Sequence, residues 1–310
     1  KKRKVIVIDN LINSSQKNIK KIQKYTNSKI IFHKVDIRNE KQLSLIFKKY
    51  KNIESVIHFA GLKSVYNSNK NPIDYFENNI GGTSTLLRVM NKFGCHKIVF
   101  SSSATVYSED QQPPYAENSA LGYKNPYALT KLTIERMLSD LSKSHKIWRI
   151  CILRYFNPVG SNPDGIIGEE VINPTNLFPI IAMVILGKKK RLNIFGNDYP
   201  SKDGTPIRDY IHVEDLAKGH LNALSHLNKS RYSIFNLGTG NGYTVLEVVK
   251  VFEKILSKHI PIKIVNRREG DVASSFSDCS KARKTLRWKA SKNLFDMCQD
   301  TLNWLNIVSK

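Results

Sequence analysis

Lys97-Ile98-Val99-Phe100-Ser101, continued by Ser102-Ser103, is the stretch that decides the fold. A short apolar run that ends in polar residues is typical of a buried strand. Asn125-Pro126 precedes Tyr127, and a proline in the first turn marks the start of a helix. Because α/β sheets bind ligands beyond the carboxyl ends of their strands, we expect this strand end and this helix start to meet over a cleft.

Similar apolar runs alternate with helical stretches through the first half of the chain. We expect strands at 5–8, 30–33, 55–58, 97–101 and 148–153, and helices at 16–25, 40–50, 72–92 and 127–145. Strands separated by helices of this length form βαβ units and a parallel sheet. The sequence therefore predicts an α/β fold with a doubly wound, Rossmann-type parallel sheet.

The pattern loosens after Arg154, where proline and glycine gather at 157–165 and 196–204. Apolar helical patterns return at 177–186, 215–227 and 245–256. We expect residues 1–155 to form a nucleotide-binding region, with 206–240 returning to it. Residues 156–205 and 241–310 are expected to form a smaller α/β region that binds a substrate.

The composition is that of a globular protein. Hydrophobic residues make up 41% of the 310 residues and charged residues 24%. No stretch approaches the ~20 consecutive apolar residues that cross a bilayer. The four cysteines, Cys95, Cys151, Cys279 and Cys298, are far apart and lack metal-ligand spacing. These features favour a reducing, cytoplasmic location with no structural metal and no membrane partner.

The formal net charge of +23 raises the question of a nucleic-acid partner. The lysines are spread along nearly every segment, with dense basic runs only at 1–4 and 188–191. A generally basic composition gives the same picture, and the aromatic interleaving of RNA-binding proteins is absent. We therefore expect no nucleic-acid partner. A dinucleotide or a nucleotide diphosphate is the kind of anionic small molecule that this charge would attract.

Tyr127 and Lys131 are four residues apart, so a helix places them on one face. An ammonium beside a phenol favours the phenolate. We expect Lys131 together with a nearby cofactor cation to lower the pKa of Tyr127 from about 10 to about 7, so that it can act as a base. The Ser103 hydroxyl at the strand end would complete a proton-handling trio. The same spacing occurs on ordinary exposed helices, so the pair alone does not indicate catalysis. The strand that ends beside it favours a catalytic role.

Asp9 directly follows an apolar strand, where dinucleotide-binding sheets hold an acid that accepts from ribose hydroxyls. An ordinary turn aspartate fits the same position. The glycine-rich phosphate turn expected about 20 residues upstream is missing, because the chain begins too late to contain it. We expect an N-terminally incomplete sequence in which two strands lose their common partner. Phe59-Ala60-Gly61 supplies small residues for a close approach to a cofactor, or for a tight turn.

Two arginine-bearing segments suit an anionic ligand. One is Arg267-Arg268 in a loop with acids nearby, and the other contains Arg208. Arginine binds phosphate bidentately, although a surface ion-pair cluster would contain the same residues. His212, four residues after Arg208, is expected to be structural.

Taken in order, these segments resemble the extended short-chain dehydrogenase/reductase superfamily and, within it, the UDP-glucose 4-epimerase family. The segments that carry the resemblance are Asp9-Asn10-Leu11, Asp36-Ile37-Arg38-Asn39, His58-Phe59-Ala60-Gly61-Leu62-Lys63, Ser101-Ser102-Ser103-Ala104-Thr105-Val106-Tyr107, Asn125-Pro126-Tyr127, Arg154-Tyr155-Phe156-Asn157-Pro158-Val159-Gly160, Ile194-Phe195-Gly196-Asn197-Asp198-Tyr199-Pro200, Asp203-Gly204-Thr205, Arg208-Asp209-Tyr210-Ile211-His212-Val213 and Arg268-Glu269-Gly270-Asp271.

The resemblance implies interconversion of UDP-glucose and UDP-galactose at C4, with NAD as cofactor and a 4-keto sugar as intermediate. Tyr127 would be the base, Lys131 its activator and ribose contact, and Ser103 the hydrogen-bond partner of the sugar. The implied NAD site consists of Asp9, Asn10, Asn13, Ser14, Asp36, Ile37, Phe59, Ala60, Gly61, Lys63, Asn78 and Phe156. The implied UDP-sugar site consists of Asn157, Asn176, Leu177, Asn193, Ile194, Phe195, Arg208, Arg268, Asp271 and Ser275.

Two positions bear on the reaction and on the range of substrates. Similar nucleotide-sugar 4,6-dehydratases carry an Asp-Glu pair where this chain has Ala104-Thr105, which disfavours dehydration. Ser275 aligns with a position where enzymes strict for hexoses carry tyrosine and enzymes with a broader range carry a small residue. The resemblance therefore implies that UDP-GlcNAc and UDP-GalNAc are accepted as well.

The resemblance also implies a homodimer that packs through the helices at 72–92 and 127–145. The alternatives are a truncated, NAD-free relative that acts only as a binding protein, and another nucleotide-sugar short-chain dehydrogenase such as a 4,6-dehydratase.

Overall fold

The computed structural model describes residues 3–169, 174–268 and 270–308, and the side chains up to residue 306. The chain divides into two compact units. Unit 1 comprises Lys1–Val106, Leu121–Leu153 and Ala223–Ile234, and unit 2 comprises Tyr107–Ala120, Arg154–Asn222 and Phe235–Lys310. The expected assignment of residues 1–155 and 206–240 to nucleotide binding, and of residues 156–205 and 241–310 to substrate binding, stays a prediction.

Unit 1 is built on parallel strands, as the sequence predicts. A four-stranded sheet has the order β10 (Tyr232–Leu237), β5 (Arg149–Tyr155), β4 (Lys97–Ser103) and β3 (Val56–His58). The register of β3 on β4 sets Val56 opposite Ile98. A separate parallel pair joins β1 (Ile6–Asp9) to β2 (Ile31–Lys34), with Ile6 opposite Ile31. In this part of the chain β1 pairs with β2 alone and β3 with β4 alone, so each of them leaves one edge without a strand partner.

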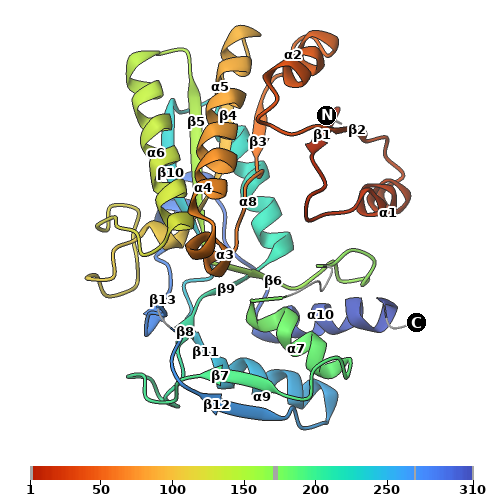
Figure 1. The fold of residues 1–310 in the computed structure, drawn as a ribbon, viewed down its shortest axis with the longest axis vertical. Helices are drawn as coiled ribbons and strands as arrows, with labels where there is room; N and C mark the ends of the chain where they lie inside the picture. The colour runs from red at the N-terminus through yellow and green to blue at the C-terminus, as the bar shows by residue number, and fades with distance from the viewer. Residues whose placement is uncertain (1–2, 170–173, 269, 309–310) are drawn as a thin grey trace. The chain divides into compact units, whose positions relative to one another are not determined.

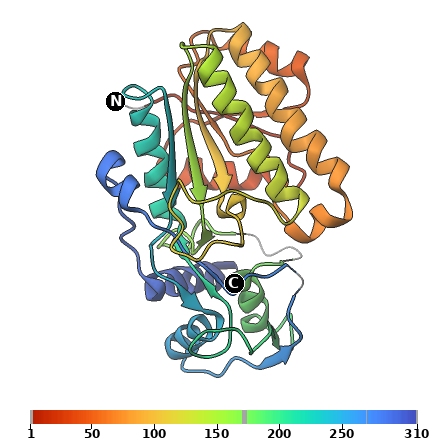
Figure 2. The same ribbon diagram turned by 90° about the vertical axis from the view of Figure 1, so that its left-hand side faces the viewer.

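Helices accompany the strands of unit 1 (Figures 1 and 2). They are α1 (Gln16–Thr26), α2 (Glu40–Lys49), α3 (Val65–Lys70), α4 (Pro72–Tyr75), α5 (Gly82–Lys92) and α6 (Pro126–Ser144), and a 3₁₀ turn spans Ala104–Val106. The predicted starts of α1, α2 and α6 are confirmed, and Asn125 caps α6 by accepting from the amide of Ala128 at 2.9 Å. The expected single helix at 72–92 is interrupted, because a π-helical segment, Phe76–Gly81, separates α4 from α5.

The core of unit 1 lies where this sheet meets the helices. Ile98, Phe100, Ile150 and Ile152 from the central strands are almost fully buried. Leu43 and Phe47 of α2 and Leu86, Val89 and Met90 of α5 pack in the same cluster. The apolar strand residues are therefore buried because helices cover them, as expected for a parallel sheet.

Unit 2 combines short strands with four helices: α7 (Leu177–Ile185), α8 (Val213–His226, whose end belongs to unit 1), α9 (Val245–Leu256) and α10 (Leu294–Val308). Parallel β6 (Asn157–Val159) pairs with β9 (Tyr210–His212), and parallel β7 (Leu192–Phe195) with β12 (Ile262–Val265). A three-stranded sheet sets β8 (Ile207–Arg208) between β11 (Tyr243–Thr244) and β13 (Ser274–Ser275). A π-helical turn, Ala282–Leu286, precedes α10.

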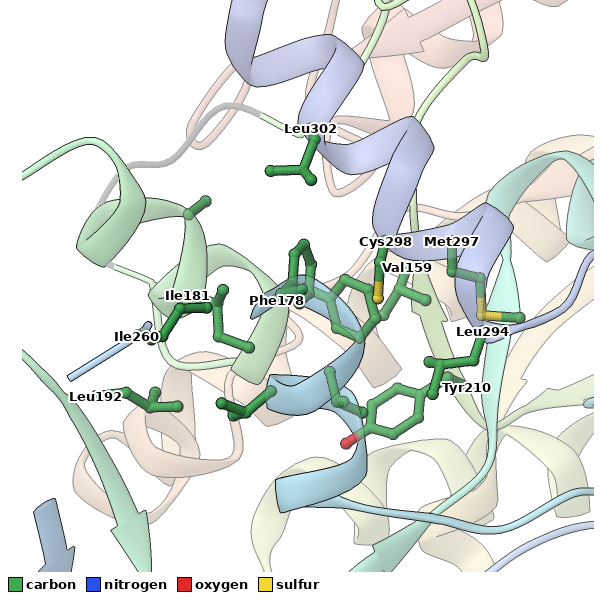
Figure 3. Packing of buried hydrophobic residues seen from close by; sticks show 14 of the residues in the cluster. Val159, Phe178, Ile181, Leu192, Tyr210, Ile260, Leu294, Met297, Cys298 and Leu302 are labelled. Atoms are coloured by element: carbon green, nitrogen blue, oxygen red, sulfur yellow. The ribbon is translucent and has the colours of Figure 1, made fainter. Parts of the chain in front are cut away.

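The second core gathers side chains from α7, α9 and α10 around the strands. Phe178, Ile181, Phe252 and Met297 are each at most 3% exposed, and Figure 3 shows Phe178 and Ile181 of α7 beside Met297 and Cys298 of α10. The sequence analysis did not predict α10. Within the residues described, no helix is long and apolar enough to span a membrane, and no cluster of three or more His, Cys, Asp or Glu could hold a metal ion.

Candidate active site

The three predicted catalytic side chains come together in unit 1. Ser103 is the last residue of β4, and Tyr127 lies in the first turn of α6 with Lys131 one turn further on. The Ser103 hydroxyl interacts with the Tyr127 phenol and acts to lower its pKa. The Lys131 ammonium nitrogen lies 5.8 Å from the centre of the Tyr127 ring. The predicted meeting of a strand end and a helix start is therefore confirmed.

Lys131 is buried, and its ammonium is held by the strand. Nζ donates to the carbonyl of Ser101 at 2.8 Å and lies 4.9 Å from the centre of the Phe100 ring. Burial lowers the pKa of Lys131 to about 8, and the charge of Glu135 opposes that effect. The ammonium is therefore near the point of losing its proton close to neutral pH.

Burial raises the pKa of Tyr127 to about 12, and the interaction with Ser103 only partly offsets this effect. Lys131 directs its nearest hydrogen bond to the Ser101 carbonyl, so the cost of desolvating a phenolate outweighs the attraction of the ammonium. The protein's own groups therefore do not lower this pKa by themselves. The expected lowering, which relies on a cofactor cation as well as on Lys131, stays a prediction.

Four predicted cofactor residues gather in the loops that follow β1 and β2. Asp9 accepts from the Leu11 amide at 2.6 Å and from the Ser14 hydroxyl at 2.9 Å. The Asn10 side-chain amide donates to Asp36 at 3.0 Å. Asp36 also pairs with Arg38 at 2.9 Å, and this contact is the main cause of a strongly lowered Asp36 pKa. Asp9, Asn10, Ser14 and Asp36 thus form one polar group, beside which Asn13 is exposed.

The loop after β3 holds the next set of predicted residues. Phe59 is 60% exposed, and Ala60 and Lys63 are exposed too. Gly61 is half-buried, and a Cβ there would lie 3.2 Å from the side-chain oxygen of Asn79. The close approach of Asn79 and the close approach of a cofactor therefore explain the glycine at position 61 equally well. Ile37 differs from the others, because its side chain is part of the hydrophobic core.

Asn79 is a site residue that the sequence analysis missed. Its oxygen accepts from the Leu62 amide at 2.7 Å, and its nitrogen donates at 3.0 Å to the Leu62 carbonyl and to the Thr130 hydroxyl. Thr130 in turn donates to the carbonyl of Tyr127 at 2.7 Å. Asn79 thus joins the loop after β3 to the helix that carries Tyr127. Its predicted neighbour Asn78 is buried and donates to Asn79 at 3.0 Å. The sequence signal that could have pointed to Asn79 is the pair of consecutive asparagines, 78 and 79, inside an expected helix.

Unit 2 brings together Arg208, Asp271 and Ser275. The Arg208 guanidinium donates to the carbonyls of Ile207 and Val272, both at 2.8 Å, and lies 3.5 Å from the Asp271 carboxylate. Ser275 is the partner of Arg208 in the pairing of β13 with β8. An arginine with two backbone contacts is held in place and still has donors for an anion.

Arg268 and Phe195 form a second group in unit 2. The Arg268 guanidinium lies 4.3 Å from the centre of the Phe195 ring, which is a cation–π contact. Asn193 and Phe195 lie on β7, whereas Ile194 between them is 1% exposed and belongs to the core. Arg267 binds Asp198 at 2.8 Å in an exposed ion pair. For Arg267, the structure therefore agrees with a surface ion pair rather than with an anion-binding role.

The remaining predicted residues lie on other elements. Phe156 is 7% exposed, and Asn157 follows it at the start of β6. Asn176 caps α7 without a side-chain hydrogen bond, and Leu177 packs against the core. His212 is fully buried beside Asp300, at 3.2 Å, which agrees with a structural role. Among the residues described, no hydrogen bond or ion pair joins the side chains of the site residues Phe156, Asn157, Asn176 and Leu177 to the two arginine groups.

Comparisons with known proteins agree on the family. Residues 1–238 match the model of the NAD dependent epimerase/dehydratase family. The UDP-glucose 4-epimerase of Dictyostelium discoideum is 52% identical over 305 residues, which cover 97% of this chain and 88% of that protein. The UDP-glucose 4-epimerase of Bacillus subtilis is 46% identical over 302 residues, covering 97% and 89%.

Solved structures give the same result. The UDP-glucose 4-epimerase of Stenotrophomonas maltophila with bound NAD and formylated UDP-arabinopyranose superposes with a TM-score of 0.96 at 43% identity, covering 99% of this chain and 91% of that one. The enzyme of Bifidobacterium longum in complex with NAD+ and UDP has a TM-score of 0.94 at 43% identity, covering 98% and 91%. The chain belongs to the NAD dependent epimerase/dehydratase family.

Proposed function

We propose that the protein interconverts UDP-glucose and UDP-galactose by oxidation and reduction at C4, with NAD as cofactor. The observation that carries the proposal is the trio of Ser103, Tyr127 and Lys131 at the junction of β4 and α6. Relatives at 46–52% identity that cover nearly the whole chain are UDP-glucose 4-epimerases, which supports the choice of substrate.

The polar residues of unit 1 fit the adenosine half of NAD. The carboxylates of Asp9 and Asp36 accept from hydroxyl donors, and both already bind side-chain or backbone donors in these loops. The exposed backbone at Phe59 and Ala60 suits a flat group laid against it. We propose that Asp9, Asn10, Asn13, Ser14, Asp36, Ile37, Phe59, Ala60, Gly61, Lys63, Asn78 and Phe156 form the NAD site, with Ile37 acting through the core.

Each of the three proposed catalytic residues has a separate role. Tyr127 removes the proton from the C4 hydroxyl, and Ser103 hydrogen-bonds to the sugar at the same point. Lys131 supplies a positive charge that favours the phenolate. NAD supplies the acceptor and donor of the hydride. Because the protein alone raises the pKa of Tyr127 to about 12, positive charge near the ring is required for the base to form at neutral pH.

We propose that unit 2 binds the UDP-sugar. Arg208 and Arg268 supply guanidinium groups for the diphosphate and the nucleoside, with Asp271, Ser275, Phe195, Asn193 and Ile194 around them and Asn157, Asn176 and Leu177 on the neighbouring elements. Arginine suits phosphate because its donors match two oxygens at once. Firm contacts to the nucleotide leave the hexose free to turn between the two hydride transfers.

Ser275 supports a broader range of substrates. Its small side chain is half-buried and is the strand partner of Arg208. The UDP-Glc/GlcNAc 4-epimerase of Campylobacter jejuni superposes with a TM-score of 0.85 at 33% identity. We propose that UDP-GlcNAc and UDP-GalNAc are interconverted as well. No turnover of UDP-GlcNAc, together with normal turnover of UDP-galactose, would reject this extension.

We also propose that the protein is a homodimer that packs through α5 and α6. A hollow of about 280 Å³ between these helices is lined by residues of both, including Leu87, Asn91, Met137 and Leu141, with Trp148 beside them. Leu87 and Trp148 are buried, whereas Met137 and Leu141 are partly exposed, and partly exposed apolar residues on a helix pair favour the packing of another helix pair. A monomeric mass in analytical ultracentrifugation at micromolar concentration would contradict this assembly.

The proposed activity can be tested in one assay. UDP-galactose is supplied, and the UDP-glucose formed is oxidised by a UDP-glucose dehydrogenase whose NADH production is followed. We expect turnover by the wild-type protein and release of NAD when it is denatured. A protein that holds UDP but neither carries NAD nor forms UDP-glucose would instead be the binding protein of the alternative hypothesis. Formation of a 4-keto-6-deoxy sugar would identify a dehydratase, which Ala104 and Thr105 do not favour.

A further inference from the structure

Glu135 is a buried acid to which the mechanism above gives no task. It is 3% exposed and lies on α6, four residues after Lys131 and eight after Tyr127. Residues four apart share a helix face, so Tyr127, Lys131 and Glu135 follow one another along the side of α6 that meets β4. The Ser102 hydroxyl, itself 2% exposed, donates to the Glu135 carboxylate at 2.5 Å.

Lys131 and Glu135 are anchored at consecutive residues of the same strand. The ammonium of Lys131 donates to the carbonyl of Ser101, and the carboxylate of Glu135 accepts from the side chain of Ser102. A buried carboxylate is costly, and a neutral amide would satisfy the Ser102 hydroxyl at a lower cost. The hydrogen bond to Ser102 therefore does not explain why the residue is an acid.

A negative charge at position 135 has an effect on Lys131 that a neutral amide would lack. Among the residues described, the titratable groups near Lys131 or Tyr127 include His58 on β3, Tyr75 on α4, and Tyr127 and Glu135 on α6. Burial lowers the pKa of His58 to about 3 and raises that of Tyr127 to about 12, and it also raises the pKa of Tyr75. None of these three is negatively charged at neutral pH. Glu135 acts on Lys131 in the direction that retains the proton.

We propose that Glu135 is a positioning residue for the reaction at C4, whose carboxylate keeps Lys131 in the ammonium form beside Tyr127. Its part in turnover depends on the proposed function, whereas its effect on the charge of Lys131 does not. Without the carboxylate, the buried amine would lose its proton at a lower pH, and Tyr127 would lose the nearby cation that favours its phenolate.

Two substitutions of similar size separate charge from packing. Glu135→Gln keeps the length and still accepts from Ser102, whereas Glu135→Asp keeps the charge but is shorter. We expect Glu135→Gln to move the alkaline limb of the kcat profile to lower pH by about one to two units and to reduce kcat at pH 8 about tenfold. The KM for UDP-galactose should stay near that of the wild type, because Glu135 does not touch the sugar.

The charge hypothesis predicts that Glu135→Asp retains the alkaline limb of the wild-type protein. Ser102→Ala, which removes the hydrogen bond and leaves the charge, should retain it as well. A purely structural role predicts the opposite order, in which the shorter Asp is at least as damaging as Gln. An unchanged profile in Glu135→Gln, or an equal shift in Glu135→Gln and Glu135→Asp, would overturn the proposal.

A second measurement needs no turnover. The titration of Lys131 itself is followed by NMR of protein carrying 13C-labelled lysine, with the Lys131 signal assigned by its absence from Lys131→Arg. We expect the Lys131 transition to occur at a lower pH in Glu135→Gln than in the wild type and in Glu135→Asp. Coincident transitions in all three would overturn the proposal. Because no sugar is added, this result is separate from success or failure of the epimerase assay.

Discussion

Tyr127 is the single side chain on which the proposed reaction depends most directly. Tyr127→Phe removes the hydroxyl that takes the C4 proton and leaves the ring in place. We expect kcat to fall about 100- to 10,000-fold, with little change in the KM for UDP-galactose. Stopped assays over hours will measure the residual rate. Tyr123→Phe, which alters a 59% exposed tyrosine just before α6, is the matched control and should keep normal activity.

In the proposed function, Ser275 limits how large a group the sugar site accepts. Ser275→Tyr should reduce kcat/KM for UDP-GlcNAc at least about tenfold relative to UDP-galactose, because the added ring would fill the space of the N-acetyl group. Ser274→Tyr serves as the control, since consecutive strand residues point to opposite faces. An equal effect of both variants on both sugars would mean that position 275 does not select the substrate.

At this scale the sequence could predict which residues of β4 and α6 lie together, but it could not predict their electrostatics. Ser103, Tyr127 and Lys131 could be placed together because a strand end, a helix start and a four-residue spacing are local patterns. The raised pKa of Tyr127 could not be foreseen, because it depends on burial by residues distant in sequence. Asn79 was missed for a similar reason, since its partners Leu62 and Thr130 are 17 and 51 residues away.

The helical run from α4 to α5 shows how a local substitution can affect an element. Gly81 and Gly82 are adjacent and both helical, at φ of −60° and −61°. A Cβ at Gly82 would lie 2.6 Å from the side chain of Ile37, whereas a Cβ at Gly81 would meet only the Phe76 carbonyl, at 3.9 Å. The same change at the two positions should therefore have opposite effects.

We expect Gly82→Ala to lower the free energy of unfolding by about 1–3 kcal/mol through overpacking. Gly81→Ala should be neutral or raise it by up to about 1 kcal/mol, because alanine is the better helix former. Urea unfolding followed by circular dichroism measures both. If the two variants were equally stable, Ile37 would move aside freely and the close contact would carry no cost.

Elements with strong periodicity could be predicted from the sequence, and short or irregular ones could not. β4, β5, α2 and α6 begin within two residues of their expected positions. The π-helical segment was not foreseen because Pro72 to Lys92 has the composition of one continuous helix. The two-residue strands β8, β11 and β13 are too short for any alternation, and only their pairing with each other defines them.

At the scale of the whole molecule, buried histidines should make the fold sensitive to acid. Burial lowers the pKa of His58 to about 3, and burial also lowers the pKa values of His212 and His220. The unfolded chain binds a proton at each histidine below a pH of about 6.5, while the folded protein does not. Stability is therefore fully present above that pH and is lost as the pH falls.

We expect His58 to lower the free energy of unfolding by up to about 2 kcal/mol between pH 6.5 and 5, and His212 and His220 to act in the same direction. Denaturant unfolding at several pH values measures the slope. His58→Asn should reduce the slope, and replacement of the exposed His145 by Gln should leave it unchanged. A slope that is the same in wild type and His58→Asn would show that His58 is protonated in the folded protein.

The pairing of β13 with β8 has a consequence for how the range of substrates can change. The amide of Asp209 donates to the carbonyl of Ser275 at 3.0 Å, and the amide of Ile207 donates to that of Ala273 at 2.8 Å, so these bonds flank Arg208 on its own strand. A change at position 275 that shifts this strand will shift the arginine as well. Under the proposed function, substitutions at this position that admit other sugars should therefore change nucleotide affinity at the same time, and compensating changes are expected next to Arg208 rather than next to the sugar.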